Sequence, residues 1–479
     1  MDTSKQIIHF SRFYPSSTEG GGCRRTAQIA DALKQLDFAF VSSRDYPWDY
    51  KNLPAYQEYL KTGGLPAGYI DKWNPTRRDD VAFMHYVSWL WSKEVKDSPS
   101  LKLALVDDPL YFAPLVQSCA LKGIPIVALC HNIESLSKSQ LVEEYQLELL
   151  NYELSLMSLC ALVVTISREE TVLLQNLGID TFFLPYYPVQ DIRKRMERIR
   201  EERKVTSKGD FLLIGTANNP PTMRGMEEMV KRWPFLSGTL GGAKLYVGGF
   251  GSEPLKDTVD NQSVIFKGAM SDEDLDKLLC TVKACVVYQS DGSGALTKIC
   301  EFLLAGVPVL VNSHAARSYY HLLGVIEFAD IDDLVQAVHS IFSAPIDMKT
   351  LEPPDAGPLL TKIRELVNVG VASHFEMGSF AREILSTGGV LAETTPESHG
   401  WKRMVLEMIK EHESKLKAER DAIAAERDNL AAERDAIAAH RDALSDSRDE
   451  IYHSLSWRLT APLRYIGKFF VRRSMRDLR

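Results

Sequence analysis

A lysine and a glutamate three positions apart follow a glycine-rich loop in the second half of the chain. Lys298 and Glu301 come after Gly292, Ser293, Gly294, Ala295 and Leu296. On a helix, residues three apart share one face, so the ammonium and the carboxylate can reach the same ligand. A glycine-rich loop that opens a helix offers backbone N–H groups and the positive end of the helix dipole to an anion. The cation suits a diphosphate and the carboxylate suits sugar hydroxyls.

The residues around this loop predict the elements that hold it. The stretch 296–305 is apolar and predicts a helix, which Gly306 and Pro308 end. Strands are predicted at 284–288, before the loop, and at 307–311, after the helix. An ordinary strand–loop–helix unit, with the lysine and the glutamate paired at the surface, would give the same pattern.

The segment resembles the donor-binding motif of GT-B glycosyltransferases, close to family four. In that motif a Gly-Ser-Gly loop leads into Lys-x-x-Glu and then into an Ala-Gly-x-Pro-Val strand start. Residues 292–294, Lys298, Glu301 and 305–309 match it in place. The resemblance covers most of residues 5–385. It implies that this loop binds a nucleotide-diphosphate sugar and that the sugar is transferred with retention of its anomeric configuration.

The resemblance also assigns functional residues to the first half of the chain. Gly21 and Gly22 match a glycine loop that closes over the donor phosphates, although a flexible turn has the same composition. His131 follows a predicted strand and matches a histidine that the family places beside the sugar, although a lone histidine is more often structural. His85 is a second candidate for that place. Ser167 matches a serine at the end of a strand, where helix capping is the default role.

Two positions depart from the family pattern. Gly215 and Thr216 end the first predicted strand of the second half, where the family usually has an arginine just after the glycine. Thr216 replaces that arginine, and Arg224 is assigned as the remaining diphosphate-binding cation. Ser293 stands where the two-glutamate pattern has an acid, so the donor sugar is left open.

Neither a metal nor another cofactor is expected. The Asp-x-Asp sequences 272–274 and 330–332 stand at predicted helix starts, where acids are favoured as caps. The seven cysteines contain no C-x-x-C pair and fit reduced thiols. A net charge of -8 argues against a general nucleic-acid binder.

Apolar runs alternate with helical patterns in two separate regions. This predicts an α/β protein with two Rossmann-like doubly wound domains. The resemblance implies the GT-B arrangement, in which the two domains face a cleft. The first, 1–190, is the expected acceptor domain, and the second, 208–345, is the expected nucleotide-sugar donor domain. The charged stretch 191–210 predicts an exposed connection, and the resemblance assigns 359–388 as a helical segment that crosses back to the first domain. The expected strands are 6–10, 103–106, 125–129 and 162–166 in the first domain, and 211–215, 244–248, 263–266, 284–288 and 307–311 in the second.

A heptad pattern follows at 401–454. Leucine or isoleucine returns every seven positions from Leu416 to Ile451, and arginine keeps the same spacing from Arg420 to Arg448. Such a repeat predicts a long C-terminal helix that forms a left-handed coiled coil, as a homo-oligomer or with a partner helix. Each heptad offers one apolar position only, so a solvated single helix remains the alternative.

The last segment, 455–479, predicts a basic amphipathic helix on an anionic membrane surface. Residues 457–479 contain seven basic residues and one acid, a charge of +6. Its Ser-Trp-Arg-x-Thr-x-Pro-Leu-Arg sequence resembles an ending found after coiled coils in bacterial surface-polysaccharide glycosyltransferases. A terminal helix docked on the enzyme is the rival interpretation. Because the N-terminus lacks a signal-peptide pattern and no apolar run approaches the ~20 residues of a membrane span, we expect a cytoplasmic protein, peripheral on the inner face of the cytoplasmic membrane.

The combined prediction is a retaining glycosyltransferase. It would move a hexosyl or deoxyhexosyl group from a nucleotide-diphosphate sugar to a growing, lipid-linked bacterial surface glycan such as an O-antigen. Two alternatives stay open, a GT-B-shaped sugar-nucleotide epimerase and a non-catalytic assembly protein of a glycan-synthesis complex.

Overall fold

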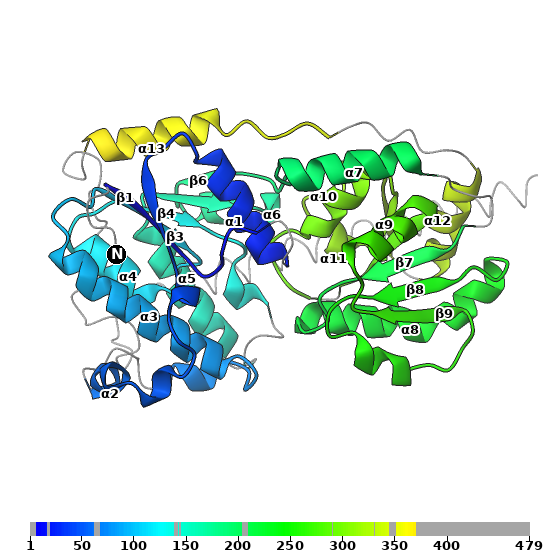
Figure 1. Cartoon of the computed structure of the whole chain (residues 1–479), viewed down its shortest axis with the longest axis horizontal. Coiled ribbons are helices and arrows are strands. Elements are labelled where there is room, and N and C mark those ends of the chain that lie inside the picture. Colours follow the sequence, from blue (N-terminus) through cyan, green and yellow to red (C-terminus); the bar gives the residue numbers. More distant parts are fainter. Residues whose placement is uncertain are drawn as a thin grey trace, which may run out of the picture. The chain divides into compact units, whose positions relative to one another are not determined.

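The computed structural model describes most of the first 369 residues (Figure 1). The described residues are 6–16, 20–61, 68–137, 142, 145–203, 209–289, 291–329, 331–343 and 351–369. They belong to one compact unit, residues 1–392. The predicted coiled coil, the predicted basic tail and residues 370–388 of the predicted crossing segment lie outside them. Over the described ranges, no helix has both the length and the apolar character needed to span a membrane.

The first domain is built on a six-stranded parallel sheet. Its strands are β1 (Ile7–Ser11), β2 (Phe38–Ser42), β3 (Leu103–Asp107), β4 (Ile126–Leu129), β5 (Leu162–Thr165) and β6 (Thr181–Phe183), in the order β2-β1-β3-β4-β5-β6. The strands β1, β3, β4 and β5 are buried along their whole length, which explains their continuous apolar sequences. The sequence missed the two edge strands, because β2 is only half-buried and β6 has three residues.

Helices cover both faces of this sheet (Figure 1). They are α1 (Gly21–Ala32), α2 (Pro54–Lys61), α3 (Arg78–Asp97), α4 (Ala113–Leu121), α5 (Gln146–Ser158) and α6 (Arg168–Asn176), with 3-10 turns at Ser43–Asp45, Tyr50–Asn52, Ile70–Lys72 and Glu134–Leu136. Ile8 and Phe10 of β1 pack with α3 and α4 in an aromatic-rich core, whereas Ile7 packs on the opposite face with Ile29 of α1. This alternation follows from the two-residue period of a strand.

The second domain repeats the plan with a second six-stranded parallel sheet. Its strands are β7 (Phe211–Ile214), β8 (Leu245–Gly248), β9 (Val264–Gly268), β10 (Ala284–Val287), β11 (Val309–Asn312) and β12 (Val325–Phe328), in the order β12-β11-β10-β7-β8-β9. Its helices are α8 (Pro220–Thr239), α9 (Asp272–Thr281), α10 (Thr297–Leu304), α11 (Ser313–Ala316) and α12 (Ile331–Ser343), with a 3-10 turn at Glu253–Asp257. The predicted α/β class with two doubly wound domains is therefore confirmed.

The strand order of the second sheet places a switch point between β7 and β10. From β7 the chain moves outward through β8 and β9, and from β10 it moves the other way through β11 and β12. In open parallel sheets, the connections leave to opposite faces at such a point and open a crevice at the carboxyl ends of the strands. The glycine-rich loop leaves β10 at this crevice, and Gly215 leaves β7 beside it.

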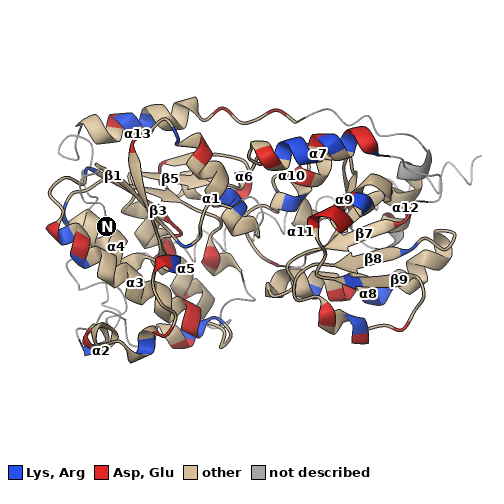
Figure 2. Ribbon diagram, viewed as in Figure 1, with Lys and Arg blue, Asp and Glu red and all other residues tan. Residues whose placement is uncertain are grey.

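The charged stretch after the first domain is a helix, α7 (Gln190–Glu202), so the prediction of an exposed connection is wrong for this part. Ile192, Met196 and Ile199 return at intervals of four and three, and they are buried in the core that also holds α10. The charged residues of the helix (Figure 2) include Arg195, which pairs with Asp276 of α9 at 2.5 Å. The many charged residues of this segment hid its amphipathic helical pattern in the sequence, because only three of its positions face the core.

Helix α13 (Gly357–Val369) follows the second domain in sequence but packs on the first. Leu359, Leu360 and Ile363 lie in the apolar core between α1 and the first sheet. Lys362 adds an exposed ion pair with Asp180 at 3.1 Å.

Candidate functional site

A cleft with a volume of about 670 Å³ lies between the two sheets and is lined by residues of both domains. The second-domain wall consists of the lining residues at 214–222, 249–250, 275, 289–302 and 317, which surround the switch point. The first-domain wall consists of the lining residues at 12–25, 44, 77, 108, 131–137 and 166. The two domains thus face one another across a cleft, as the predicted GT-B class requires.

The donor loop, residues 291–296, has a backbone that glycine makes accessible. Gly292 has a φ of 104° and Gly294 has a φ of 70°, a region that residues with a Cβ rarely adopt. Arg317 donates hydrogen bonds to two carbonyls of the loop. Its Nε donates to the Gly294 carbonyl at 2.8 Å and its Nη2 donates to the Ser293 carbonyl at 2.9 Å. Two consecutive carbonyls of the loop are thus held by one guanidinium.

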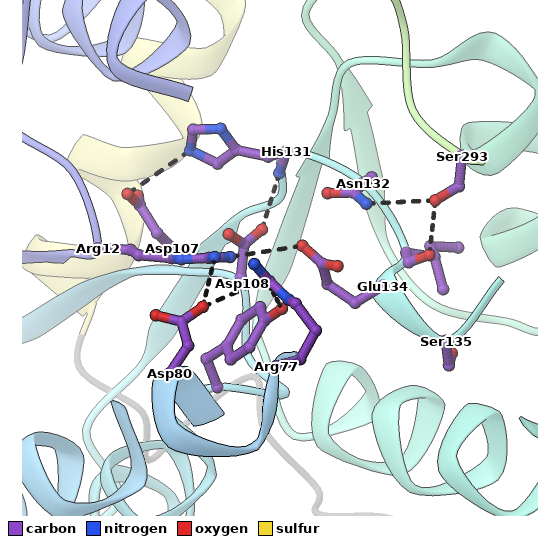
Figure 3. A network of polar contacts seen from close by, with 12 residues as sticks. Arg12, Arg77, Asp80, Asp107, Asp108, His131, Asn132, Glu134, Ser135 and Ser293 are labelled. Carbon is purple, nitrogen blue, oxygen red and sulfur yellow. Dashed lines mark hydrogen bonds and ion pairs between the residues drawn. The ribbon is translucent and has the colours of Figure 1, made fainter. Parts of the chain in front are cut away.

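The donor loop also contacts the first domain directly. The Gly294 N–H donates to Glu170 at 2.8 Å, and the Ser293 hydroxyl donates to the Ile133 carbonyl at 2.8 Å. Asn132 donates to the Ser293 hydroxyl at 3.2 Å (Figure 3). A Cβ on Gly294 would lie 2.7 Å from the carbonyl oxygen of His131. Glycine at 294 is therefore required both by its φ and by the approach of the two domains.

Lys298 lies in the first turn of α10 and is directed across the end of β7. Its Nζ donates to the Ile214 carbonyl at 2.9 Å and lies close to Gly215, whose Cβ, if present, would be 3.2 Å away. Burial lowers the pKa of Lys298 to about 8. The sequence predicted this cation for a diphosphate, and the structure places it at the switch point.

Glu301 lies one turn further along α10 and joins the two domains. It forms an ion pair with Arg24 of α1 and accepts a hydrogen bond from the Tyr186 hydroxyl at 2.7 Å. Glu301 is 5% exposed and still lines the cleft. Each carboxylate oxygen carries two lone pairs, so each retains capacity for one more hydrogen bond. The sequence predicted the carboxylate but not its partners, which come from distant segments.

Gly21 and Gly22 begin α1 in the first-domain wall. Both line the cleft, but neighbouring side chains also explain why they are glycines. A Cβ on Gly22 would meet the Phe13 ring at 2.5 Å, and one on Gly21 would lie 3.1 Å from the Thr297 hydroxyl of α10. The two glycines thus let α1 approach α10, which brings Arg24 to Glu301.

His131 follows β4 and enters a network with the acids that end β3. Its backbone N–H donates to Asp108 at 3.0 Å, and its Nε2 lies 3.6 Å from Asp107 (Figure 3). Burial opposes protonation of the imidazole, but Asp108 and Asp107 outweigh it and raise the pKa of His131. Conversely, burial would raise the pKa of Asp107, but His9 and His131 hold that pKa well below its ordinary value.

Several predicted site residues lie elsewhere or act differently. Arg224 is exposed on α8 and is not among the residues that line the cleft. His85 packs against the Tyr69 ring at 4.7 Å in the aromatic core, where burial lowers its pKa to about 4. Ser167 caps α6, since its hydroxyl accepts from the Glu170 N–H at 3.2 Å. Thr216 does line the cleft, at an exposed position after β7.

Arginines absent from the sequence prediction provide most of the cleft's positive charge. The lining cations are Arg12, Arg24, Arg25, Arg44, Arg77, Lys298 and Arg317. The lining acids are Asp108, Glu134 and Glu301. Seven cations against three acids leave a formal charge of +4, in a chain whose overall charge is -8. A cluster of histidine, cysteine, aspartate and glutamate suited to a metal ion does not occur within the described ranges.

A second group that the sequence missed lies at the first-domain end of the cleft (Figure 3). Arg12 donates to Asp80 at 3.0 Å, lies 3.7 Å from Glu134 and has its guanidinium 4.3 Å from the centre of the Tyr111 ring. Arg77 donates to the Tyr111 hydroxyl at 2.8 Å. These residues come from four separate segments, so no local motif marks them.

No protein-family profile matches this chain, and no curated protein matches it. Solved structures similar to it include an α,α-trehalose-phosphate synthase from Burkholderia xenovorans, with 11% identity, 80% of this chain and 98% of that chain covered, and a TM-score of 0.48. The sucrose-phosphate synthase of Thermosynechococcus elongatus has 14% identity, coverage of 86% and 100%, and a TM-score of 0.44. HepE of Anabaena, solved with UDP and glucose, has 13% identity, coverage of 85% and 99%, and a TM-score of 0.43.

Proposed function

We propose that this protein is a retaining glycosyltransferase that moves a hexosyl or deoxyhexosyl group from a nucleotide-diphosphate sugar to a glycan. One observation supports the proposal above all others. The donor loop, Lys298 and Glu301 converge with His131 in one cleft at a strand switch point. Ligands of open α/β sheets bind at such points.

The charge of the cleft fits a nucleotide diphosphate. Seven cations and three acids line it, so the cleft attracts a dianion although the chain as a whole is acidic. Lys298 and the amides at the start of α10 are the groups we assign to the diphosphate. The family resemblance noted in the sequence assigns the same groups.

The chemistry follows from where charge develops. When the bond between the anomeric carbon and the diphosphate oxygen breaks, the bonding electrons stay on the diphosphate. A buried ammonium at Lys298 and fixed backbone dipoles then stabilise the transition state more than the ground state. Glu301, held by Arg24 and Tyr186, is positioned to accept hydrogen bonds from hydroxyls of the donor sugar, with His131 on the opposite wall.

The test is product analysis by NMR. Full-length protein is incubated with a panel of nucleotide-diphosphate sugars and methyl glycosides as acceptors. We expect a new glycoside whose anomeric configuration equals that of the donor. A new nucleotide sugar formed without an acceptor would instead indicate the epimerase, and absence of both binding and turnover would favour the non-catalytic assembly protein.

We assign the acceptor to a lipid-linked surface glycan and the protein to the inner face of the cytoplasmic membrane, on the basis of the basic tail alone. In the test, Arg464, Lys468 and Arg472 are replaced together by glutamate in the full-length protein. We expect sedimentation with phosphatidylglycerol vesicles to be lost in the variant and to be absent with phosphatidylcholine vesicles for both proteins. Equal sedimentation of variant and wild type with anionic vesicles would contradict the assignment.

A further inference from the structure

Two carboxylate oxygens in the first-domain wall have no hydrogen-bond partner within the part of the chain that the structure describes. They are Oδ2 of Asp108 and Oε2 of Glu134, and both residues line the cleft. Asp108 is 1% exposed and Glu134 is 4% exposed. A buried carboxylate oxygen without a donor is unfavourable, so its persistence needs an explanation.

The remaining oxygen of each carboxylate is held in place. Asp108 accepts the His131 N–H at 3.0 Å through Oδ1, and Glu134 lies 3.7 Å from Arg12 through Oε1. Each carboxylate is therefore held through one oxygen, while the other is buried without a donor among the described residues. The two belong to one polar network, drawn in Figure 3.

The backbone of Asp108 is strained at this position. Its φ is 43°, in the left-handed region, which aspartate and asparagine occupy more often than other non-glycine residues but still rarely. Strained residues cluster at binding and catalytic sites, where the surrounding structure holds them. This conformation turns the chain at the end of β3 and lets the Asp108 carboxylate accept the His131 N–H.

The charges around these acids decide what chemistry they recognise. Arg12 and Arg77 both contact Asp80, at 3.0 Å and 3.3 Å. The labelled residues of the network in Figure 3 include these two arginines and four acids, Asp80, Asp107, Asp108 and Glu134. An anion is disfavoured at such a site, whereas a hydroxyl group donates well to a carboxylate.

We propose that Asp108 and Glu134 form the acceptor subsite and bind two hydroxyl groups of an uncharged sugar, not a phosphate. The inference rests on the proposed glycosyltransferase function and names its acceptor class. The hydroxyls donate to the unpartnered oxygens of the two carboxylates. The subsite adjoins His131 and thus the place assigned to the donor sugar.

The test uses Asp108→Asn and Glu134→Gln in the full-length protein, with Asp79→Asn as the matched control. Asparagine tolerates the left-handed region, so the first variant keeps the backbone and loses only the charged acceptor. Asp79 is exposed and pairs with Lys51 away from the cleft. Thermal unfolding checks that each variant folds.

Three measurements follow. Calorimetry gives the donor Kd, NMR gives transfer to methyl hexosides and methyl 6-deoxyhexosides, and saturation-transfer NMR detects binding of those glycosides without any donor. We expect kcat/KM for the acceptor to fall roughly 10- to 100-fold in both variants, as for loss of a hydrogen bond to a charged group. Donor Kd stays within about twofold, and Asp79→Asn matches wild type.

Several outcomes overturn the inference. Unchanged transfer in both variants contradicts the proposed subsite. A loss of donor affinity as large as the loss of transfer would assign the two acids to the donor sugar. Preference for glycoside phosphates over uncharged glycosides contradicts the acceptor class. If the wild type binds no nucleotide sugar, the proposed function fails separately. The saturation-transfer signal still tests the subsite in that case. A signal that is present in the wild type and lost in the variants supports the subsite, and any other result contradicts it.

Discussion

The two walls of the cleft are built in different ways. The largest part of the second-domain wall is one stretch, residues 289 and 291–302, in which backbone conformation and glycine create the surface and Arg317 fixes it. Residues at 214–222, 249–250 and 275 complete this wall. The first-domain wall is a set of side chains from the ends of separate strands and helices, linked by ion pairs. The difference suggests a division of labour: a backbone surface suits a phosphate, which every donor shares, and a side-chain surface suits the variable arrangement of sugar hydroxyls.

The largest expected effect is at Glu301, where the two walls meet. Glu301→Ala breaks the ion pair with Arg24, so transfer should fall by about 100-fold or more and stability by about 2–4 kcal/mol, because a largely buried guanidinium loses this carboxylate. The double variant Arg24→Met with Glu301→Met separates the two roles. It should regain the melting temperature and not the activity. Recovery of transfer in the double variant would show that the pair is only structural.

Gly294→Ala tests the contact between the walls. The new Cβ would be strained by a φ of 70° and would lie 2.7 Å from the His131 carbonyl. We expect a loss of stability of about 1–3 kcal/mol and weaker donor binding by about tenfold. Gly238→Ala is the control, since Gly238 lies in the last turn of α8 and a Cβ there meets nothing within 4 Å. It should be neutral or slightly stabilising in thermal unfolding.

Donor binding should depend on pH through the second-domain wall. Because burial lowers the pKa of Lys298 to about 8, the ammonium is mostly protonated at pH 7 and mostly neutral at pH 9. Affinity for a nucleotide diphosphate should therefore fall about tenfold between these values, as protonation of the lysine becomes a cost of binding. Calorimetry at several pH values measures the change. The profile should flatten in Lys298→Met, and an unchanged slope in that variant would assign the titration to another group.

The smallest expected effect is at Arg224. This residue is exposed on α8 and does not line the cleft. Arg224→Ala should change donor affinity and transfer by less than about twofold. A tenfold loss of donor affinity would show that Arg224 belongs to the donor site. The second-domain wall would then depend on a distant side chain as the first-domain wall does.

The sequence predicted the second-domain wall far better than the first. The loop, Lys298 and Glu301 are contiguous, and glycine spacing reports the backbone directly, so a local pattern was enough. The acids and arginines of the first-domain wall meet only because parallel strands align their carboxyl ends and α3 crosses nearby, and a local pattern cannot show this. His131 was selected because it follows a strand and matches a histidine of the family pattern, whereas Asp108 also follows a strand but matches no motif and was missed.

The fold was also predicted from local sequence patterns, and these patterns missed several elements. Continuous apolar runs revealed the central strands, but the edge strands β2 and β12 have partly exposed residues and gave no clear signal. Helix α7 was hidden by its charges because it buries only Ile192, Met196 and Ile199. Burial on both faces made the central strands clear in the sequence, whereas the edge strand β9 was predicted at 263–266 although most of its residues are partly exposed.

Calorimetric titration with nucleotide-diphosphate sugars tests the central claim most directly, with wild type and Lys298→Met compared at pH 7. The account predicts that the wild type binds at least one member of the panel at one site per chain and that Lys298→Met, still folded, binds it about 100-fold more weakly. Absence of binding across the panel, or equal binding by the variant, would contradict the claim that this cleft holds an activated sugar.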